Sequence, residues 1–267
     1  MNLSDSALAR TAAEAGAAIV RSRYGATLTR IAKSPNDFAT DADIDAERVI
    51  LDVVRSHRPL DALVAEESGQ SGQSGAGDRT WLIDPLCGTL NFAAETPLAA
   101  VNVALRAHGR VDVAAVADPI SGEIFWTDEG RAVLRRDGSD EPIAPNAQSL
   151  IVDINIDAPF PNGATFRAAD LLGDNAFLDI FRPRVISSTL AVAWVAAGRR
   201  AAYVTDGDLR DNVHFSAGIA LCQAAGCVVT DLHGAPLGAE VNGLVVAADH
   251  STHEALLGLI RSRSRRS

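Results

Sequence analysis

The chain has 267 residues, of which 47% are hydrophobic and 22% are charged, so its composition excludes a disordered or fibrous protein. Its 34 acidic residues outnumber its 24 basic ones, and the net charge of −10 argues against a nucleic-acid or membrane-surface binder. No apolar run approaches the ~20 residues that cross a bilayer, and residues 1–10 contain no signal-peptide core. We therefore expect a cytoplasmic globular protein, built as one large domain or two closely joined halves.

In the N-terminal half, the spacing of apolar residues predicts helices over residues 4–24 and 44–57, separated by a polar loop over 31–43. Short apolar runs between turn residues predict strands at 63–65, 81–83, 100–106, 111–117 and 123–126. Residues 68–78 are rich in Gly, Ser and Gln, which indicates a surface loop. This half is expected to be a mostly antiparallel sheet with helices to one side.

A polar, proline-containing stretch over residues 135–148 is the best boundary candidate, and we place the two halves at 1–142 and 143–267. Beyond it strands and helices alternate, which predicts an α/β half with a predominantly parallel or mixed sheet. Its strands are expected at 150–156, 184–188, 201–204, 227–231 and 243–247. Its helices are expected at 164–172, 190–197, 215–225 and 252–262. Cys222 and Cys227 lack the spacing of a metal knuckle and are predicted to be core thiols.

Carboxylates gather at three places where predicted strands or loops end, namely Asp37, Asp41 and Asp43, then Glu66 and Glu67, then Asp84. Taken singly, each acid fits a solvated loop residue. Like charges a few ångströms apart raise each other's pKa, and a divalent cation removes that cost. Oxygen ligands favour Mg²⁺ or Mn²⁺. Taken together with the motif that contains Asp84, the acids predict a metal site.

That motif covers residues 81–92 and reads Trp-Leu-Ile-Asp-Pro-Leu-Cys-Gly-Thr-Leu-Asn-Phe. A strand delivers Asp84, Pro85 forces a turn, and Gly88 and Thr89 open a helix whose free N–H groups suit a phosphate. The segment resembles the signature of the inositol monophosphatase family, which are magnesium-dependent, lithium-sensitive phosphomonoesterases. The family form is Asp-Pro-(Leu/Ile)-Asp-Gly-Thr-x-Asn-Phe, and Cys87 stands where its second aspartate would be.

The resemblance covers nearly the whole chain. Residues 64–68 resemble the family's Gly-Glu-Glu-Ser element, and residues 33–43 resemble its mobile loop. Asp118-Pro119 resembles a turn between core strands, and residues 187–199 resemble the Gly-Ser-Ala-Ala helix, with Ile186 in place of the glycine. Residues 213–218 resemble the second signature, Trp-Asp-x-Ala-Ala-Gly, with His214 in place of its aspartate and a short apparent insertion before it.

The resemblance implies an α/β (α+β) fold, the layered αβαβα sandwich of sugar phosphatases, with the active site between the two halves. It implies a first Mg²⁺ held by Glu66, Asp84 and the backbone carbonyl of Leu86. Asp43 and Thr89 would activate the attacking water, with Glu66 assisting, and the N–H groups of Gly88 and Thr89 would hold the phosphate. The implied function is hydrolysis of a small phosphomonoester, such as a cyclitol, sugar or nucleoside phosphate, in a homodimer.

The second metal of the family would be shared between Asp84 and the positions of Cys87 and His214, and these leave three hypotheses open. In the first, they bind a softer ion, such as Zn²⁺ or Fe²⁺. In the second, the protein uses one metal, and a protonated His214 supplies an acid. In the third, an altered family member binds a phosphorylated metabolite, serves as a partner subunit or performs non-phosphatase chemistry. A carboxylate could also be restored from the apparent insertion, by Asp206, Asp208 or Asp211.

Overall fold

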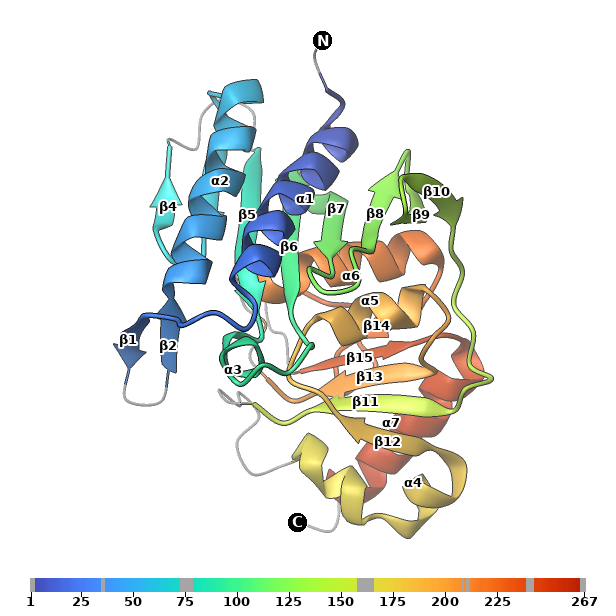
Figure 1. Cartoon of the computed structure of the whole chain (residues 1–267). Helices are drawn as coiled ribbons and strands as arrows, with labels where there is room; N and C mark the ends of the chain where they lie inside the picture. The colour runs from blue at the N-terminus through green and yellow to red at the C-terminus, as the bar shows by residue number, and fades with distance from the viewer. Residues whose placement is uncertain are drawn as a thin grey trace. The chain divides into compact units, whose positions relative to one another are not determined.

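The computed structural model describes residues 3–34, 37–72, 79–157, 166–207, 209, 212–238 and 243–264 (Figure 1). The chain divides into two compact units. The first consists of Met1–Pro142 with two later segments, Ser188–Leu190 and Val213–Leu221. The second consists of Ile143–Ser187, Ala191–Asn212 and Cys222–Ser267. Within the described ranges, no helix is both long enough and apolar enough to span a membrane.

The first unit is built on an eight-stranded sheet in the order β10-β9-β8-β7-β6-β5-β3-β4. Only β3 and β5 pair in parallel among these neighbours, which confirms the predicted, mostly antiparallel sheet. The strands are β3 (Ala62–Ala65), β4 (Gly69–Ser71), β5 (Thr80–Cys87), β6 (Ala100–Ala107), β7 (Arg110–Ala117), β8 (Ile124–Asp128), β9 (Arg131–Arg136) and β10 (Ser139–Pro142). The short helix α3 (Thr89–Ala93) directly follows β5.

Two predicted helices, α1 (Asp5–Arg23) and α2 (Asp41–His57), lie side by side against one face of this sheet (Figure 1). The Ser4 hydroxyl caps α1 by accepting a hydrogen bond from the N–H of Ala7 at 3.2 Å. Both helices bury their apolar faces in one core with the sheet. The helices approach each other closely at Gly16, where an added Cβ would lie 2.6 Å from Cδ1 of Ile50.

The predicted loop over residues 31–43 is wrong. Strands β1 (Arg30–Ser34) and β2 (Asp37–Thr40) form an antiparallel hairpin there, and α2 begins at Asp41 rather than 44. Thr40 is extended, with φ −118° and ψ 168°, and it shares a capping box with Asp43, so the helix starts three residues earlier than its first apolar residue indicated.

The stretch predicted as a boundary, 135–148, begins inside the first unit. Strands β9 and β10 form a hairpin that extends the large sheet as far as Pro142. Arg135 and Asp140 face each other across this hairpin and form an ion pair, with 2.8 Å between Nε and Oδ1. Residues 135–142 of this stretch therefore belong to a solvated edge of the sheet, and the division between the two units follows Pro142 within the same stretch.

The second unit has a five-stranded sheet in the order β12-β11-β13-β15-β14. Strand β11 pairs in parallel with β12 and β13, and the other pairs are antiparallel, so the predicted mixed sheet is confirmed. The strands are β11 (Ile151–Asn155), β12 (Arg182–Val185), β13 (Ala202–Thr205), β14 (Val228–Thr230) and β15 (Leu244–Ala247). Along this part of the chain, the predicted helices at 190–197, 215–225 and 252–262 are confirmed as α5 (Leu190–Ala196), α6 (Val213–Ala225) and α7 (His250–Ser264). Most of α6, residues Val213–Leu221, belongs to the first unit.

The segment before β12 differs from the prediction of one helix at 164–172. It forms the 3₁₀ helix η1 (Ala168–Gly173) and the six-residue helix α4 (Asn175–Ile180), while residues 164 and 165 lie outside the described residues. Asp174 caps α4 by accepting a hydrogen bond from the N–H of Ala176 at 3.0 Å. Such a short helix gives too few apolar repeats to be recognised by spacing.

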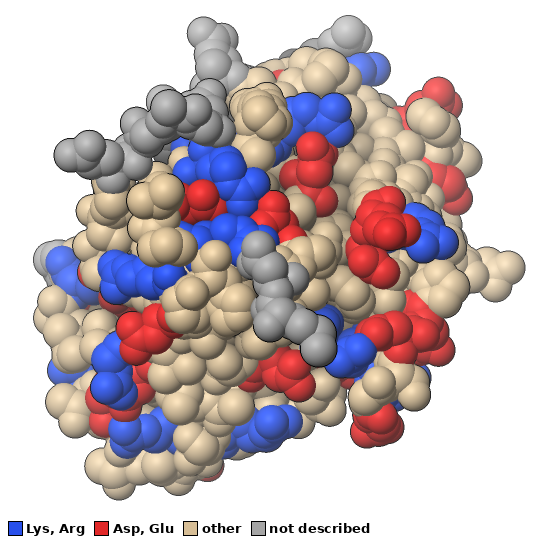
Figure 2. All heavy atoms as spheres, turned by 90° about the horizontal axis from the view of Figure 1, so that it is seen from above, with Lys and Arg blue, Asp and Glu red and all other residues tan. Residues whose placement is uncertain are grey.

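The surface carries charges of both signs. On the face that Figure 2 shows, Lys and Arg side chains lie among Asp and Glu side chains. The predicted absence of nucleic-acid and membrane partners stays a prediction.

Candidate active site and metal centre

Asp84 is the centre of the candidate site, and its position follows from the end of β5. It is fully buried and pairs with Asn102 of β6 in the antiparallel ladder. The next residue, Pro85, has no N–H to donate, and the ladder shifts register between Asp84 and Cys87. Within this irregular segment the N–H of Leu86 donates to Oδ1 of Asp84 at 3.1 Å. Sequence and sheet together therefore fix the carboxylate at a break in the ladder.

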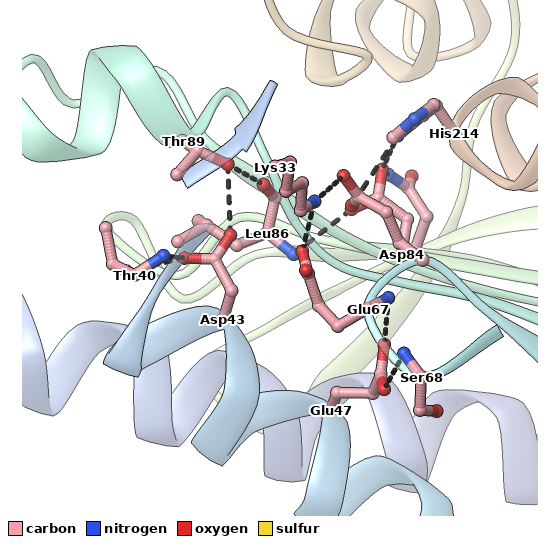
Figure 3. Close-up of polar contacts among 12 residues, drawn as sticks. Lys33, Thr40, Asp43, Glu47, Glu67, Ser68, Asp84, Leu86, Thr89 and His214 are labelled. Atoms are coloured by element: carbon pink, nitrogen blue, oxygen red, sulfur yellow. Dashed lines mark hydrogen bonds and ion pairs between the residues drawn. The ribbon is translucent and has the colours of Figure 1, made fainter. Parts of the chain in front are cut away.

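The side chains of Asp84, Cys87 and His214 converge at this break. Each offers one atom able to bind a metal, and these atoms lie within 4.8 Å of one another. His214 comes from α6 and places Nδ1 at 2.7 Å from Oδ2 of Asp84 (Figure 3). The structure thus brings together residues that are up to 130 positions apart in sequence.

Glu66 follows β3 and borders this cluster. Its Oε2 lies 3.9 Å from Nδ1 of His214, and its Oε1 lies 2.8 Å from Nζ of Lys33. The same ammonium group lies 2.6 Å from Oε1 of Glu67. Lys33 belongs to β1, and Figure 3 shows its side chain directed toward Glu67. The hairpin that the sequence prediction missed therefore supplies a cation to the acidic site.

The ionisable groups of the cluster strongly perturb one another. Burial raises the pKa of Glu66 to about 8, and the negative charge of Asp84 adds to this effect. Burial opposes ionisation of Asp84, but the charge and hydrogen bond of His214 dominate and lower its pKa. Burial alone would lower the pKa of His214, yet the charge and hydrogen bond of Asp84 raise it well above its usual value. Burial, with the charge of Asp84, raises the pKa of the Cys87 thiol. The surroundings of Asp84 therefore favour a cation.

Asp43 and Thr89 form the second polar pair of the site. Asp43 is buried at the start of α2, where its Oδ2 accepts hydrogen bonds from the N–H and hydroxyl of Thr40 at 2.8 and 2.5 Å. The Thr89 hydroxyl lies 3.0 Å from Oδ1 of Asp43 and 3.1 Å from the carbonyl oxygen of Leu86 (Figure 3). Burial raises the pKa of Asp43, although its hydrogen bonds from Thr40 and Thr89 act in the opposite direction. Gly88, with φ 95°, lies in the left-handed region and starts α3.

Sequence reasoning missed three residues that support this site. Glu47 of α2 is 3% exposed and accepts hydrogen bonds from the backbone N–H groups of Glu67 and Ser68 at 2.7 and 2.9 Å (Figure 3). Its position, four residues after Asp43 on the same helix face, was a usable signal. Asn102 interrupts an apolar strand, which was a second signal.

The third missed residue, Thr189, has no comparable signal. Its N–H donates to Sγ of Cys87 at 3.3 Å, and its hydroxyl accepts a hydrogen bond from Nδ2 of Asn102 at 2.9 Å. The same Nδ2 lies 3.2 Å from Oδ2 of Asp84. These contacts connect two of the candidate metal-binding side chains through one buried network.

The remaining sequence candidates have other surroundings. Asp206 is buried in the second unit, where its Oδ2 lies 3.0 Å from Nε of Arg167. Asp208 and Asp211 lie outside the described residues. Cys222 is buried, as predicted for a core thiol, and donates to the carbonyl oxygen of Val192 at 3.2 Å, whereas Cys227 is half-buried.

Comparisons with known proteins agree over most of the chain. The sequence model of the inositol monophosphatase family matches residues 3–265. Nus factor SuhB of Escherichia coli is 34% identical over 241 residues, which cover 86% of this chain and 84% of that protein. Inositol-1-monophosphatase of Caulobacter vibrioides is 28% identical over 240 residues, covering 86% and 90% of the two chains.

Solved structures give the same result for the fold. The extragenic suppressor protein SuhB from Bartonella henselae superposes with a TM-score of 0.79 at 24% identity, covering 93% of this chain and 95% of that one. Inositol monophosphatase from Anabaena superposes with a TM-score of 0.75 at 26% identity, covering 95% and 94%. These matches confirm the predicted α/β fold of the sugar-phosphatase type.

Proposed function

The chain belongs to the inositol monophosphatase family, and we propose that it hydrolyses a small phosphomonoester, such as a cyclitol, sugar or nucleoside phosphate. Membership of this family supports the activity of a metal-dependent phosphatase. The observation that carries the proposal is the contact between Asp43 and the hydroxyl of Thr89, which also contacts the carbonyl oxygen of Leu86. One hydroxyl thereby lies between the proposed proton acceptor, Asp43, and the carbonyl proposed to bind the metal.

A hard divalent ion fits the oxygen atoms of this site. Oε2 of Glu66 is buried, and no described residue donates a hydrogen bond to it. Carboxylate and carbonyl oxygens are the ligands that Mg²⁺ prefers. Glu66, Asp84 and the backbone carbonyl of Leu86 would hold it, as in the implied first metal position. When bound, this ion supplies an activated water and offsets the charge of the phosphate.

The chain's own residues would position the reactants. Thr40 fixes Oδ2 of Asp43, so that Oδ1 is directed to the Thr89 hydroxyl. We expect Asp43 and Thr89 to orient the attacking water and to accept its proton, with Glu66 assisting. The N–H groups of Gly88 and Thr89, at the start of α3, would donate to phosphate oxygens.

A second candidate function is binding of a phosphorylated metabolite, or a partner-subunit role, without turnover. Cys87 and His214 favour it because they occupy the positions where the family signatures have aspartates. The Escherichia coli relative, moreover, is named a Nus factor rather than a phosphatase. Oligomeric state is a separate proposal: a homodimer rests on the resemblance alone, and sedimentation of the purified protein would measure it.

Phosphate release decides between these two functions. Purified protein would be incubated with a cyclitol, a sugar and a nucleoside monophosphate in Mg²⁺, Mn²⁺ and Zn²⁺. We expect release, and we expect Asp43→Asn and Thr89→Val to lower kcat by about 10²- to 10⁴-fold, the usual contribution of acid–base catalysis. Asp52→Asn, at an exposed position of the same helix as Asp43, is the matched control.

Two results would contradict the proposed roles. Hydrolysis that Asp43→Asn leaves unchanged would exclude Asp43 as the proton acceptor. No release from any ester, combined with retained binding of these esters, would favour the second candidate. The double variant Cys87→Asp with His214→Asp restores the family's acids, and we expect it to raise Mg²⁺-dependent hydrolysis.

A further inference from the structure

We propose that Asp84, Cys87 and His214 form a binding site for a soft divalent cation of the zinc class, selective against Mg²⁺. The proposal deepens the proposed function and rests on it for the role of the site in hydrolysis. The binding itself depends only on the donor atoms, so it can be measured whether or not the protein hydrolyses an ester.

The donor atoms are close enough to surround one ion. All three lie within 4.8 Å of one another, and Nδ1 of His214 is 2.7 Å from Oδ2 of Asp84. Zinc binds nitrogen and oxygen at about 2.0–2.2 Å and sulfur at about 2.3 Å, so tetrahedral ligand atoms are roughly 3.4–3.7 Å apart. Asp84 and His214 therefore have to separate by only about 1 Å or less. Their hydrogen bond is then replaced by two bonds to the ion.

The kinds of donor atom select the metal. Mg²⁺ prefers six oxygen ligands in octahedral geometry and usually keeps several waters. Thiolate sulfur and imidazole nitrogen are the ligands of zinc and related ions. Cys87, as a thiolate, and Asp84 supply two negative charges, which balance a divalent ion. Three protein ligands also leave a fourth position, as in catalytic zinc sites.

The surrounding hydrogen bonds hold two of the ligands in place. The N–H of Thr189 donates to Sγ of Cys87 at 3.3 Å, and Asn102 donates to Oδ2 of Asp84 at 3.2 Å. Asn102 also donates to the Thr189 hydroxyl, so its buried amide connects the residue that contacts Cys87 with the carboxylate of Asp84. Such contacts orient metal ligands and tune them. The cluster therefore has the supporting structure of a built site in addition to its three donors.

Glu66 lies beside the cluster that would leave a fourth coordination position open. Oε2 of Glu66 lies 3.9 Å from Nδ1 of His214, and no described residue donates a hydrogen bond to it. An ion at the Asp84–Cys87–His214 site would therefore lie beside the carboxylate that we assign to the first metal position.

Cobalt(II) is the probe, because a thiolate bound to Co²⁺ gives a charge-transfer absorption band in the near ultraviolet. The full chain would be stripped with a chelator and titrated with Co²⁺. We expect a band that saturates at one equivalent, is removed by stoichiometric Zn²⁺ and survives millimolar Mg²⁺. Elemental analysis after dialysis against Zn²⁺ should give one zinc per chain.

Variants locate the site. Cys87→Ser should abolish the band, and His214→Ala should weaken Co²⁺ binding by about 100-fold or more, since loss of a supporting contact alone costs 10- to 100-fold. Cys222→Ser and Cys227→Ser are matched cysteine controls and should keep the band. Far-ultraviolet circular dichroism checks that each variant is folded. If Cys87→Ser does not fold, Asn102→Ala should still weaken Co²⁺ binding by at least about 10-fold.

Absence of the band, or a band that survives in Cys87→Ser, would overturn the proposal. Phosphate release in Mg²⁺ without any cobalt band would overturn this site and leave the proposed function intact. A saturating band without phosphate release in any metal would support the site and contradict the proposed function.

Discussion

Glu47 offers a direct test of how the site is held in place. Its carboxylate accepts hydrogen bonds from the N–H groups of Glu67 and Ser68, immediately after Glu66. A hydrogen bond to a charged group contributes about 1.5–3 kcal/mol. Glu47→Ala removes two of them and should lower the free energy of unfolding by about 3–6 kcal/mol. Glu47→Gln keeps one acceptor oxygen and should lose about 1.5–3 kcal/mol.

Urea unfolding would measure these losses, and hydrogen exchange at residues 67 and 68 would show whether they are local. Both amides should exchange faster in Glu47→Ala, and metal binding that involves Glu66 should weaken. Asp52→Ala, at an exposed position of the same helix, should change stability by less than about 0.5 kcal/mol. If Glu47→Ala matched this control and left the two amides protected, the assigned contacts would be refuted.

Three further changes test the packing, the turn and the pH response. Gly16→Ala should cost about 1–3 kcal/mol in thermal unfolding, because its Cβ would meet Cδ1 of Ile50 at 2.6 Å; the cost should shrink in an Ile50→Val background. Gly88→Ala should cost about 1–2 kcal/mol and lower phosphate release, since φ there is 95°; an unchanged kcat would speak against the assigned phosphate contact. Burial, only partly opposed by Arg200, raises the pKa of Asp153 to about 6. The pKa of Asp153 in the folded protein lies above the unfolded value of 3.8, so its contribution to the free energy of unfolding is full below about pH 4 and is lost as pH rises through 6. Compared with Asp153→Asn, the protein should therefore lose up to about 3 kcal/mol of unfolding free energy between about pH 4 and pH 6, as measured by urea unfolding. If the unfolding free energies of the two proteins changed equally with pH, the effect would be excluded.

The sequence predicts the long helices and central strands because their apolar spacing matches the period of each element. It fails at the β1–β2 hairpin, where every residue of β1 is exposed and no apolar alternation exists. The β9–β10 hairpin did leave a signal. Asp137 and Gly138, with φ 51° and 79°, form its turn, and Asp-Gly is a strong hairpin dipeptide.

The candidate site is only partly readable from sequence. Asp84 and Thr89 belong to a local motif, so spacing and resemblance are enough to single them out. Thr189 acts on Cys87 from 102 positions away, and only the folded chain shows this contact. Lys33 contacts two carboxylates because a polar hairpin carries it there, and local patterns do not encode that approach.

The first unit is assembled from separate segments of the chain, and this affects the order in which its parts are synthesised. Two of its segments, Ser188–Leu190 and Val213–Leu221, are synthesised long after the strand that bears Asp84. His214 follows Asp84 by 130 positions, a delay on the order of ten seconds at ordinary rates of translation. A nascent chain that has reached only Pro142 thus holds an acidic residue whose imidazole neighbour does not yet exist. Assembly of the candidate site is therefore a late event, because a polypeptide released before residue 213 lacks the segment that carries His214.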